Sequence, residues 1–284
     1  MRVNRRTALA GLALQQTANG QTPSFRSSPP AISAFWEPLD RQMVDWLAPA
    51  PDAHVLDAGC GRGDHVRLFA ERCRVTGVDK NPEALAYARG RMGNGDPWKR
   101  VEWREADLTK LPFGSASFDL VWASHVFHGL REMERGAGEL KRVLKRGGRF
   151  VLRENRVLSA VLPADLGYGR HALEARADLA FSIWLAEDRM ERGRYPYLWG
   201  QILRQAGLRD VRAKSFLHEA NPPFSEAQQE YLRYHVGRKA EWQIADEDKR
   251  TLQEICDPAS PRYFLKREDI YYVSVSTIYY GVKA

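Results

Sequence analysis

Five short strand-like segments recur through the first half of the chain, four of them mainly apolar, and each ends beside a polar or acidic residue. Between them lie segments whose apolar residues repeat every three to four positions, as over residues 132–145, which is typical of amphipathic helices. This alternation of strand-like and helix-like segments predicts an α/β fold with a mostly parallel sheet. The predicted strands of this half cover residues 55–57, 74–78, 100–104, 118–123 and 149–153.

The second half of the chain continues the pattern with two long insertions. We predict a sixth strand over residues 208–216 and a last strand over 270–282, where β-branched and aromatic side chains dominate. The insertions cover about 156–193 and 218–266 and have helical spacing. Both leave from the carboxyl ends of predicted parallel strands, so we expect them to form a helical cap over that edge of the sheet.

The segment Val55 to Gly63, V-L-D-A-G-C-G-R-G, carries the strongest chemical signal in the chain. Its three glycines, at every second position, let the backbone turn tightly and let a ligand approach main-chain N–H groups. Dinucleotide-binding loops follow G-x-G-x-x-G, and the third glycine of that pattern would fall at Asp64. A carboxylate at this helix start disfavours a pyrophosphate. The loop therefore indicates a nucleotide-like ligand that carries a positive centre instead of phosphates.

An acidic residue, Asp79, follows the second predicted strand. A carboxylate about 20 positions beyond the first loop glycine is placed to accept hydrogen bonds from both ribose hydroxyls. Pro82 then stands in the first turn of a predicted helix, where its missing N–H is not needed. Asp79 and the adjacent Lys80 are therefore candidate ligand-binding residues.

The order of these motifs resembles the class I S-adenosylmethionine-dependent methyltransferases, over about residues 35–155. D-x-G-C-G-x-G at 57–63 is similar to motif I of that family, and L-K-R-G-G-R-F-V-L at 144–152 is similar to motif III. The resemblance implies a Rossmann-like, doubly wound, mostly parallel seven-stranded sheet, with S-adenosylmethionine as cofactor. It is strongest to the small-molecule group that is like the enzymes of ubiquinone and menaquinone biosynthesis.

The same resemblance implies which residues bind the cofactor. The glycine loop would pass under the methionine part, Asp79 would bind the ribose, and Asp107 would accept from the adenine amino group. The implied cofactor-binding set is Asp57, Gly59, Cys60, Gly61, Gly63, Asp79, Lys80, Asp107, Leu108 and Ser124.

Two histidines follow the fourth predicted strand, at the sheet edge where open parallel sheets bind ligands. A methyl group on a sulfonium is already activated, so the protein has mainly to position the reactants and exclude water. A hydroxyl, phenol or activated carbon acceptor gains from a general base, and histidine titrates near neutrality. His125 and His128 are therefore the candidate catalytic residues. A structural histidine that bonds loop backbone is an equally good interpretation of either one.

A different motif, N-P-P-F at 221–224, is typical of methyltransferases that act on amino groups. In those enzymes it follows the fourth strand, where this chain has A-S-H-V-F instead. We therefore interpret the two prolines as a stiff connection into the second insertion.

Composition narrows the partners of the protein. The 284 residues carry a net charge of +7 and an isoelectric point near 9.4. The arginines are scattered rather than gathered in a basic run with interleaved aromatic side chains. This distribution argues against nucleic acid as a partner. Three cysteines, Cys60, Cys73 and Cys256, have neither disulfide nor zinc spacing. We expect no metal, a reducing cytoplasmic compartment and, without an apolar stretch of roughly 18 residues, no membrane span.

Residues 1–30 are predicted to be a flexible leader, and residues 31–284 a single methyltransferase-like domain with its cap. N-R-R-T at 4–7 and the short apolar stretch after it resemble an export signal, but no cleavage pattern follows. We expect this segment not to direct export.

These patterns predict transfer of a methyl group from S-adenosylmethionine to an O, N or C atom of a small-molecule metabolite. Two alternatives stay open: an RNA or protein methyltransferase of the same fold, and a cofactor-binding regulatory protein without turnover. The acceptor and the oligomeric state are not encoded in any motif of the chain.

Overall fold

The computed structural model describes residues 30–93, 95–96, 98–154, 158–163, 165–191, 198–242 and 244–284. The predicted leader lies outside these residues, apart from its last one. The chain divides into two compact units. The sheet unit comprises Trp36–Leu158, Leu198–His218 and Ser274–Ala284, and the helical unit comprises the described parts of Met1–Phe35, Ser159–Tyr197 and Glu219–Val273.

Within the described residues, eight strands form one mixed sheet, in the order β3-β2-β1-β4-β5-β8-β6, with β7 paired to β8. The first five are β1 (His54–Ala58), β2 (Arg74–Asp79), β3 (Val101–Glu105), β4 (Phe118–Ser124) and β5 (Leu144–Arg153). The others are β6 (Leu158–Leu162), β7 (Leu208–Ala220) and β8 (Tyr271–Lys283). Neighbours among the first five strands run parallel, and β8 runs antiparallel to β5.

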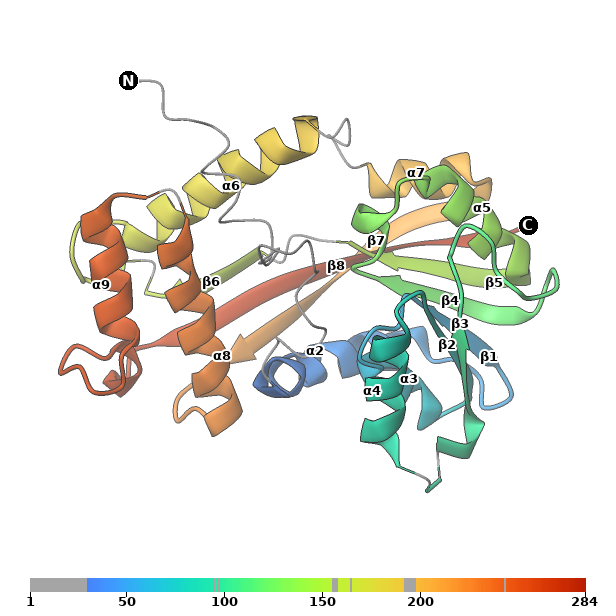
Figure 1. Ribbon diagram of the computed structural model, residues 1–284, viewed down its shortest axis with the longest axis horizontal. Coiled ribbons are helices and arrows are strands. Elements are labelled where there is room, and N and C mark those ends of the chain that lie inside the picture. Colours follow the sequence, from blue (N-terminus) through green and yellow to red (C-terminus); the bar gives the residue numbers. More distant parts are fainter. Residues whose placement is uncertain are drawn as a thin grey trace. The chain divides into compact units, whose positions relative to one another are not determined.

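Helices cover both faces of the sheet unit. Figure 1 shows α2, α3 and α4 on one side and α5 and α7 on the other. Their bounds are α2 (Pro30–Leu47), α3 (Asp64–Ala70), α4 (Pro82–Met92), α5 (Met133–Val143) and α7 (Trp199–Gln205). Two 3-10 turns, Trp98–Arg100 and Phe127–Gly129, follow α4 and β4.

The apolar pattern accounts for these helices and for the core of the sheet unit. On α2, Leu39, Met43 and Leu47 recur every four residues and are fully buried. On α4, the Asn81 side chain accepts from the Glu83 N–H and Pro82 follows it, so the helix start has its cap. Fully burying a side chain of leucine or methionine size stabilises the fold by about 1.5–3 kcal/mol. This burial, more than helix propensity, holds α2 on the sheet.

The helical unit has its own core and its own ion pairs. Its helices are α6 (Leu173–Glu191), α8 (Glu226–Gly237) and α9 (Asp246–Cys256), with 3-10 turns at Arg238–Glu241 and Phe264–Lys266. The rings of Phe35 and Tyr231 stack with centroids 3.8 Å apart. The ammonium of the buried Lys239 lies 3.1 Å from a carboxylate oxygen of Asp178. No described helix has a stretch that is both long and apolar enough to cross a membrane.

The parallel order around β1 and the antiparallel β8 confirm the predicted Rossmann-like α/β fold. Two details differ from prediction. The short β6 was not predicted, and β5 begins at Leu144 rather than at Arg149. The pairing of β4 with β5 shifts register between Phe118 and Leu120. The polar stretch Lys145–Gly148, outside the predicted strand, is part of β5 next to this irregularity.

Candidate cofactor and active site

The predicted site residues lie along one edge of the sheet unit. The carboxyl ends of β3, β2, β1 and β4 are neighbours in that order. Asp57 stands near the end of β1, Asp79 ends β2, and Ser124 ends β4, while Asp107 follows β3 by two residues. The structure therefore brings the acidic residues and the glycine loop to the edge where open parallel sheets bind ligands.

The loop between β1 and α3 needs its glycines. Gly59 and Gly63 have φ values of +77° and +79°, which L side chains rarely adopt. A Cβ on Gly59 would lie 2.5 Å from a methyl group of Val126, and one on Gly63 would lie 2.8 Å from the end of Met92. The Gly59 and Cys60 N–H groups donate to the Val78 carbonyl at 2.7 and 2.8 Å. The loop is thus folded back on the end of β2, with no room for side chains at its turns.

Asp79 fastens this loop from the neighbouring strand. One carboxylate oxygen accepts from the Gly61 N–H at 3.0 Å, and the other accepts from the Asn81 N–H at 2.9 Å. Each carboxylate oxygen has a second lone pair for a ligand hydroxyl. Lys80, next in the chain, is exposed. Asp79 therefore has a structural function in the glycine loop as well as its predicted position for a ribose.

The other predicted cofactor residues differ in exposure. Asp107 is exposed, and its Oδ1 accepts from the N–H and the hydroxyl of Thr109, both at 2.8 Å. These hydrogen bonds lower the pKa of Asp107. Leu108 and Cys60 are buried, and burial raises the pKa of the Cys60 thiol. The Ser124 hydroxyl is buried and has no hydrogen-bond partner among the described residues.

Asp57 is an unusual carboxylate for the end of a strand. It is 1% exposed, and its Oδ2 has no hydrogen-bond partner among the described residues. Burial raises its pKa to about 7; the charge of His65 opposes this, and the charge of Asp79 reinforces it. A buried carboxylate that lacks a full complement of hydrogen bonds and stands before a glycine loop favours a ligand with positive charge. The residues present therefore fit S-adenosylmethionine better than a pyrophosphate.

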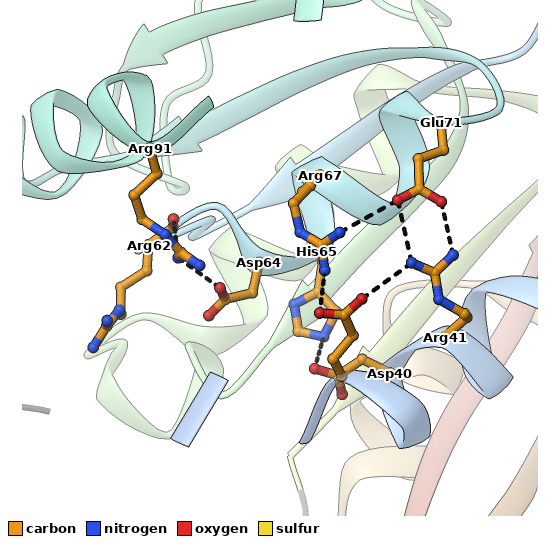
Figure 2. A network of polar contacts seen from close by, with 9 residues as sticks. Asp40, Arg41, Arg62, Asp64, His65, Arg67, Glu71 and Arg91 are labelled. Atoms are coloured by element: carbon orange, nitrogen blue, oxygen red, sulfur yellow. Dashed lines mark hydrogen bonds and ion pairs between the residues drawn. The ribbon is translucent and has the colours of Figure 1, made fainter. Parts of the chain in front are cut away.

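A buried polar network that the sequence did not predict lies beside Asp57. The Arg153 guanidinium donates to Asp40 at 2.6 Å and to the Ser276 hydroxyl at 3.0 Å, and His65 Nε2 lies 3.6 Å from Asp40. Figure 2 shows His65 at the Asp40 carboxylate. Burial disfavours the charge on Asp40, but His65 and Arg153 more than offset it and hold its pKa well below the usual range. Against burial, the Asp40 charge raises the pKa of His65.

The two predicted catalytic histidines have different environments. His125 has a φ of +54°, and its N–H donates to the Arg153 carbonyl at 2.8 Å. Solvent reaches its side chain, yet desolvation by the surrounding protein lowers its pKa to about 3, and the Arg153 charge acts in the same direction. His128 is half-exposed, and its Nδ1 lies 2.8 Å from Oε2 of the buried Glu154.

Sequence reasoning missed Asp40, His65, Arg153 and Glu154. Glu154 directly follows β5, so it carried the strand-end signal that singled out Asp79. The other three had no such signal. The N-P-P-F motif follows β7, with Asn221 in the helical unit and not at the end of β4.

Comparison with known proteins agrees with this geometry. Residues 56–152 match the family described as "Methyltransferase domain". The ubiquinone/menaquinone biosynthesis C-methyltransferase of Paracoccus denitrificans is 35% identical over 115 residues, 39% of this chain and 46% of that protein. The 2-phytyl-1,4-naphtoquinone methyltransferase of Thermosynechococcus vestitus is 30% identical over 167 residues, 56% of this chain and 68% of that protein. This chain thus spans only about half the length of the first of these relatives.

A solved structure shares the fold. The crystal structure of a putative methyltransferase from Bacillus halodurans superimposes with a TM-score of 0.51 at 19% identity, over 86% of this chain and 98% of the other. This likeness shows the fold, and the family is shown by the naphthoquinone enzyme, of which the chain covers more than two thirds. The chain belongs to the class I S-adenosylmethionine-dependent methyltransferases, whose methyl donor is S-adenosylmethionine.

Proposed function

We propose that the protein transfers the methyl group of S-adenosylmethionine to an oxygen, nitrogen or carbon atom of a small-molecule metabolite. The observation that carries this proposal is the bond from the Gly61 N–H to Asp79, which ties a positive-φ glycine loop to a strand-end carboxylate. Carboxylates at this edge disfavour phosphates and favour a cationic ligand. When bound, the cofactor supplies an already activated methyl group.

The proposed roles follow the predicted positions. The glycine loop, with Asp57 and Cys60 beside it, holds the methionine part of the cofactor, and Asp79 with Lys80 holds the ribose. Asp107 binds the adenine amino group through the oxygen that does not hold Thr109, with the buried Leu108 beside the ring. Ser124, whose hydroxyl lacks a partner among the described residues, lies at the end of β4 for a further contact.

When the acceptor does not have to lose a proton, methyl transfer requires only that the protein position the two reactants and exclude water. For an acceptor that loses a proton, we propose His128 as the general base rather than His125. A base works best when its pKa is near the working pH, and the pKa of His125, lowered to about 3, makes it a weak base.

A small-molecule acceptor is favoured over a nucleic acid. One relative described above is named for ubiquinone and menaquinone biosynthesis, and the other is named for a naphthoquinone. Many arginines of the sheet unit are already in ion pairs with neighbouring carboxylates, as Arg41 is with Glu71 and Arg91 with Asp64, which reduces the field available to an RNA backbone. The three cysteines are free, which supports a reducing, cytoplasmic compartment.

Calorimetry tests the cofactor. S-adenosylhomocysteine should bind and NADH should not. Asp79→Ala should weaken S-adenosylhomocysteine binding by about 100-fold, since it removes hydrogen bonds to a charged group worth about 1.5–3 kcal/mol each. Asp96→Ala, which removes an exposed carboxylate, is the matched control and should bind normally. NADH binding without S-adenosylhomocysteine binding would contradict the proposal.

Methyl-labelled S-adenosylmethionine tests the acceptor class. Incubation with demethylated quinol precursors and with small-molecule extracts should give labelled product. Salt-sensitive binding to tRNA in a gel shift, with label in the RNA, would support the macromolecular alternative instead. Tight cofactor binding without label in any small-molecule, RNA or protein fraction would support the regulatory alternative.

A further inference from the structure

Glu154 connects the end of β5 to the turn that follows β4. Its side chain is 1% exposed. One oxygen, Oε1, accepts from the N–H groups of both Val126 and Phe127, and the other, Oε2, meets His128 Nδ1 at 2.8 Å. A single buried carboxylate therefore holds the turn backbone and one histidine ring at the same time.

The chemistry of the carboxylate sets the state of that ring. An ionised carboxylate accepts hydrogen bonds and donates none, so Nδ1 of His128 must carry the hydrogen in the bond to Oε2. In a neutral imidazole the lone pair then belongs to Nε2. A buried acid that orients the ring of a more exposed histidine through Nδ1 is the arrangement that prepares a histidine to accept a proton. His128 is 52% exposed, against 1% for Glu154.

The turn lies directly against the cofactor loop. Val126, whose N–H bonds Glu154, occupies the space in which a Cβ of Gly59 would lie, 2.5 Å from that position. The residues that Glu154 holds are thus in contact with the glycine loop at the end of β1. A shift of the Glu154 carboxylate would move His128 and a wall of that loop together.

We propose that Glu154 is a positioning residue for methyl transfer, which holds His128 as the Nδ1–H tautomer so that Nε2 takes a proton from the acceptor. The proposal rests on the proposed function and names its substrate class: acceptors with an ionisable O–H or an acidic C–H. The acceptor proton goes to Nε2, and the electron pair it leaves forms the bond to the methyl carbon. The pair of the sulfur–methyl bond returns to sulfur, which gives neutral S-adenosylhomocysteine and an imidazolium.

Nitrogen NMR on the full chain with labelled histidine tests the tautomer without an acceptor. With S-adenosylhomocysteine present, at an alkaline pH where an ordinary imidazole is neutral, the wild type should show Nδ1 protonated and Nε2 unprotonated. His128→Gln assigns the signals among the seven histidines. Glu154→Gln should reverse the tautomer, because its carbonyl can keep the Val126 and Phe127 N–H groups while its amide donates to Nδ1. Nε2–H on His128 in the wild type would overturn the proposal.

A double-mutant cycle tests the function of the dyad with any acceptor that the protein methylates. Glu154→Gln should lower kcat by about 10²- to 10⁴-fold, the usual contribution of a general base, with S-adenosylhomocysteine affinity kept. In a His128→Ala background the same change should have no further effect. An equal loss in that background would show a structural role and contradict the proposal. Glu134→Gln, at an exposed site on α5, is the control and should keep full kcat. If the wild type does not bind S-adenosylhomocysteine at all, that result would count against the proposed function instead.

Discussion

Two networks of charged side chains start from adjacent residues of α2 and differ in burial rather than in geometry. Arg41 meets Glu71 of the α3 end at 2.7 Å, with side chains 39% and 34% exposed. Asp40 meets Arg153 at 2.6 Å, with side chains 9% and 4% exposed, and also meets His65 of α3. Figure 2 shows how close the two lie: Arg41 points to Glu71, and Asp40 points to His65.

The difference teaches where charge matters in this protein. Water and salt screen the Arg41 pair, so it contributes little to the free energy of unfolding. The charges of the Asp40 network are shielded from solvent, so the stability of each charge depends on its partners in the network. His65 lies in the first turn of α3, directly after the glycine loop. The buried network therefore supports the helix that follows the glycine loop, whereas the exposed one lies on the surface of the same two helices.

The largest expected effect is from Arg153→Met. It leaves the buried Asp40 carboxylate with His65 as its remaining charged partner, so we expect the free energy of unfolding to fall by about 3–5 kcal/mol. Urea denaturation followed by tryptophan fluorescence measures this loss. A loss below about 1 kcal/mol would mean that the buried and exposed networks are equivalent.

Asp57→Asn sharpens the buried side of the comparison, because no guanidinium pairs with Asp57 among the described residues as Arg153 does with Asp40. Its folded pKa, about 7, lies above the unfolded value of about 3.9. The folded protein therefore holds an extra proton between these values, and the contribution of Asp57 to stability falls as pH rises through that window. The variant should gain on the wild type from pH 4 to 7 and level off above, with a difference on the order of 2–4 kcal/mol. Thermal unfolding at a series of pH values checks it. A variant that loses stability relative to the wild type as pH rises from 4 to 7 would have the wrong sign.

Replacing both partners, as Asp40→Leu with Arg153→Met, separates the cost of an orphaned charge from the cost of the lost pair. Apolar replacement of a buried ion pair is often neutral, so the double variant should recover to within about 1–2 kcal/mol of the wild type. The same urea titration tests it. A double variant as unstable as Arg153→Met would show that the pair itself, with its bond to Ser276, carries the stability.

The smallest effect is expected from Arg41→Met. Glu37 and Glu71 both keep Arg67 as a partner. The free energy of unfolding should therefore fall by about 0.2–1 kcal/mol at most. Added salt should shrink even this difference. A loss above about 2 kcal/mol in urea denaturation would contradict the distinction between the two networks.

Local patterns predicted the parts of the molecule that local chemistry determines. The glycines at 59, 61 and 63 have positive φ, and their spacing was enough to predict the tight loop. Asp57 and Asp79 could be singled out because each is an acidic residue at the end of a predicted strand. The buried network could not be predicted in this way. Asp40 and Arg153 are 113 positions apart and come together only when α2 packs on the sheet. No spacing along the chain encodes that contact.

The missed strand β6 has a similar physical reason. It has five residues, and its pairing with a strand more than 100 positions later gives no local signal. Glu154 is different, because its position after β5 repeated a signal already in use. The sequence could not show that Glu154 contacts His128. The two residues are 26 positions apart, and the pairing of β4 with β5 brings them together.

The contact between Gly59 and Val126 sets a rule for redesigning the protein. Residues 125–128 are the natural place to diversify if a new acceptor is wanted, since they carry both candidate histidines. Val126 should be kept in such a library, because its methyl groups pack directly against Gly59 of the glycine loop. A library that varies position 126 would disturb the glycine loop along with the turn, whereas one that holds 126 and 127 fixed leaves the loop unchanged.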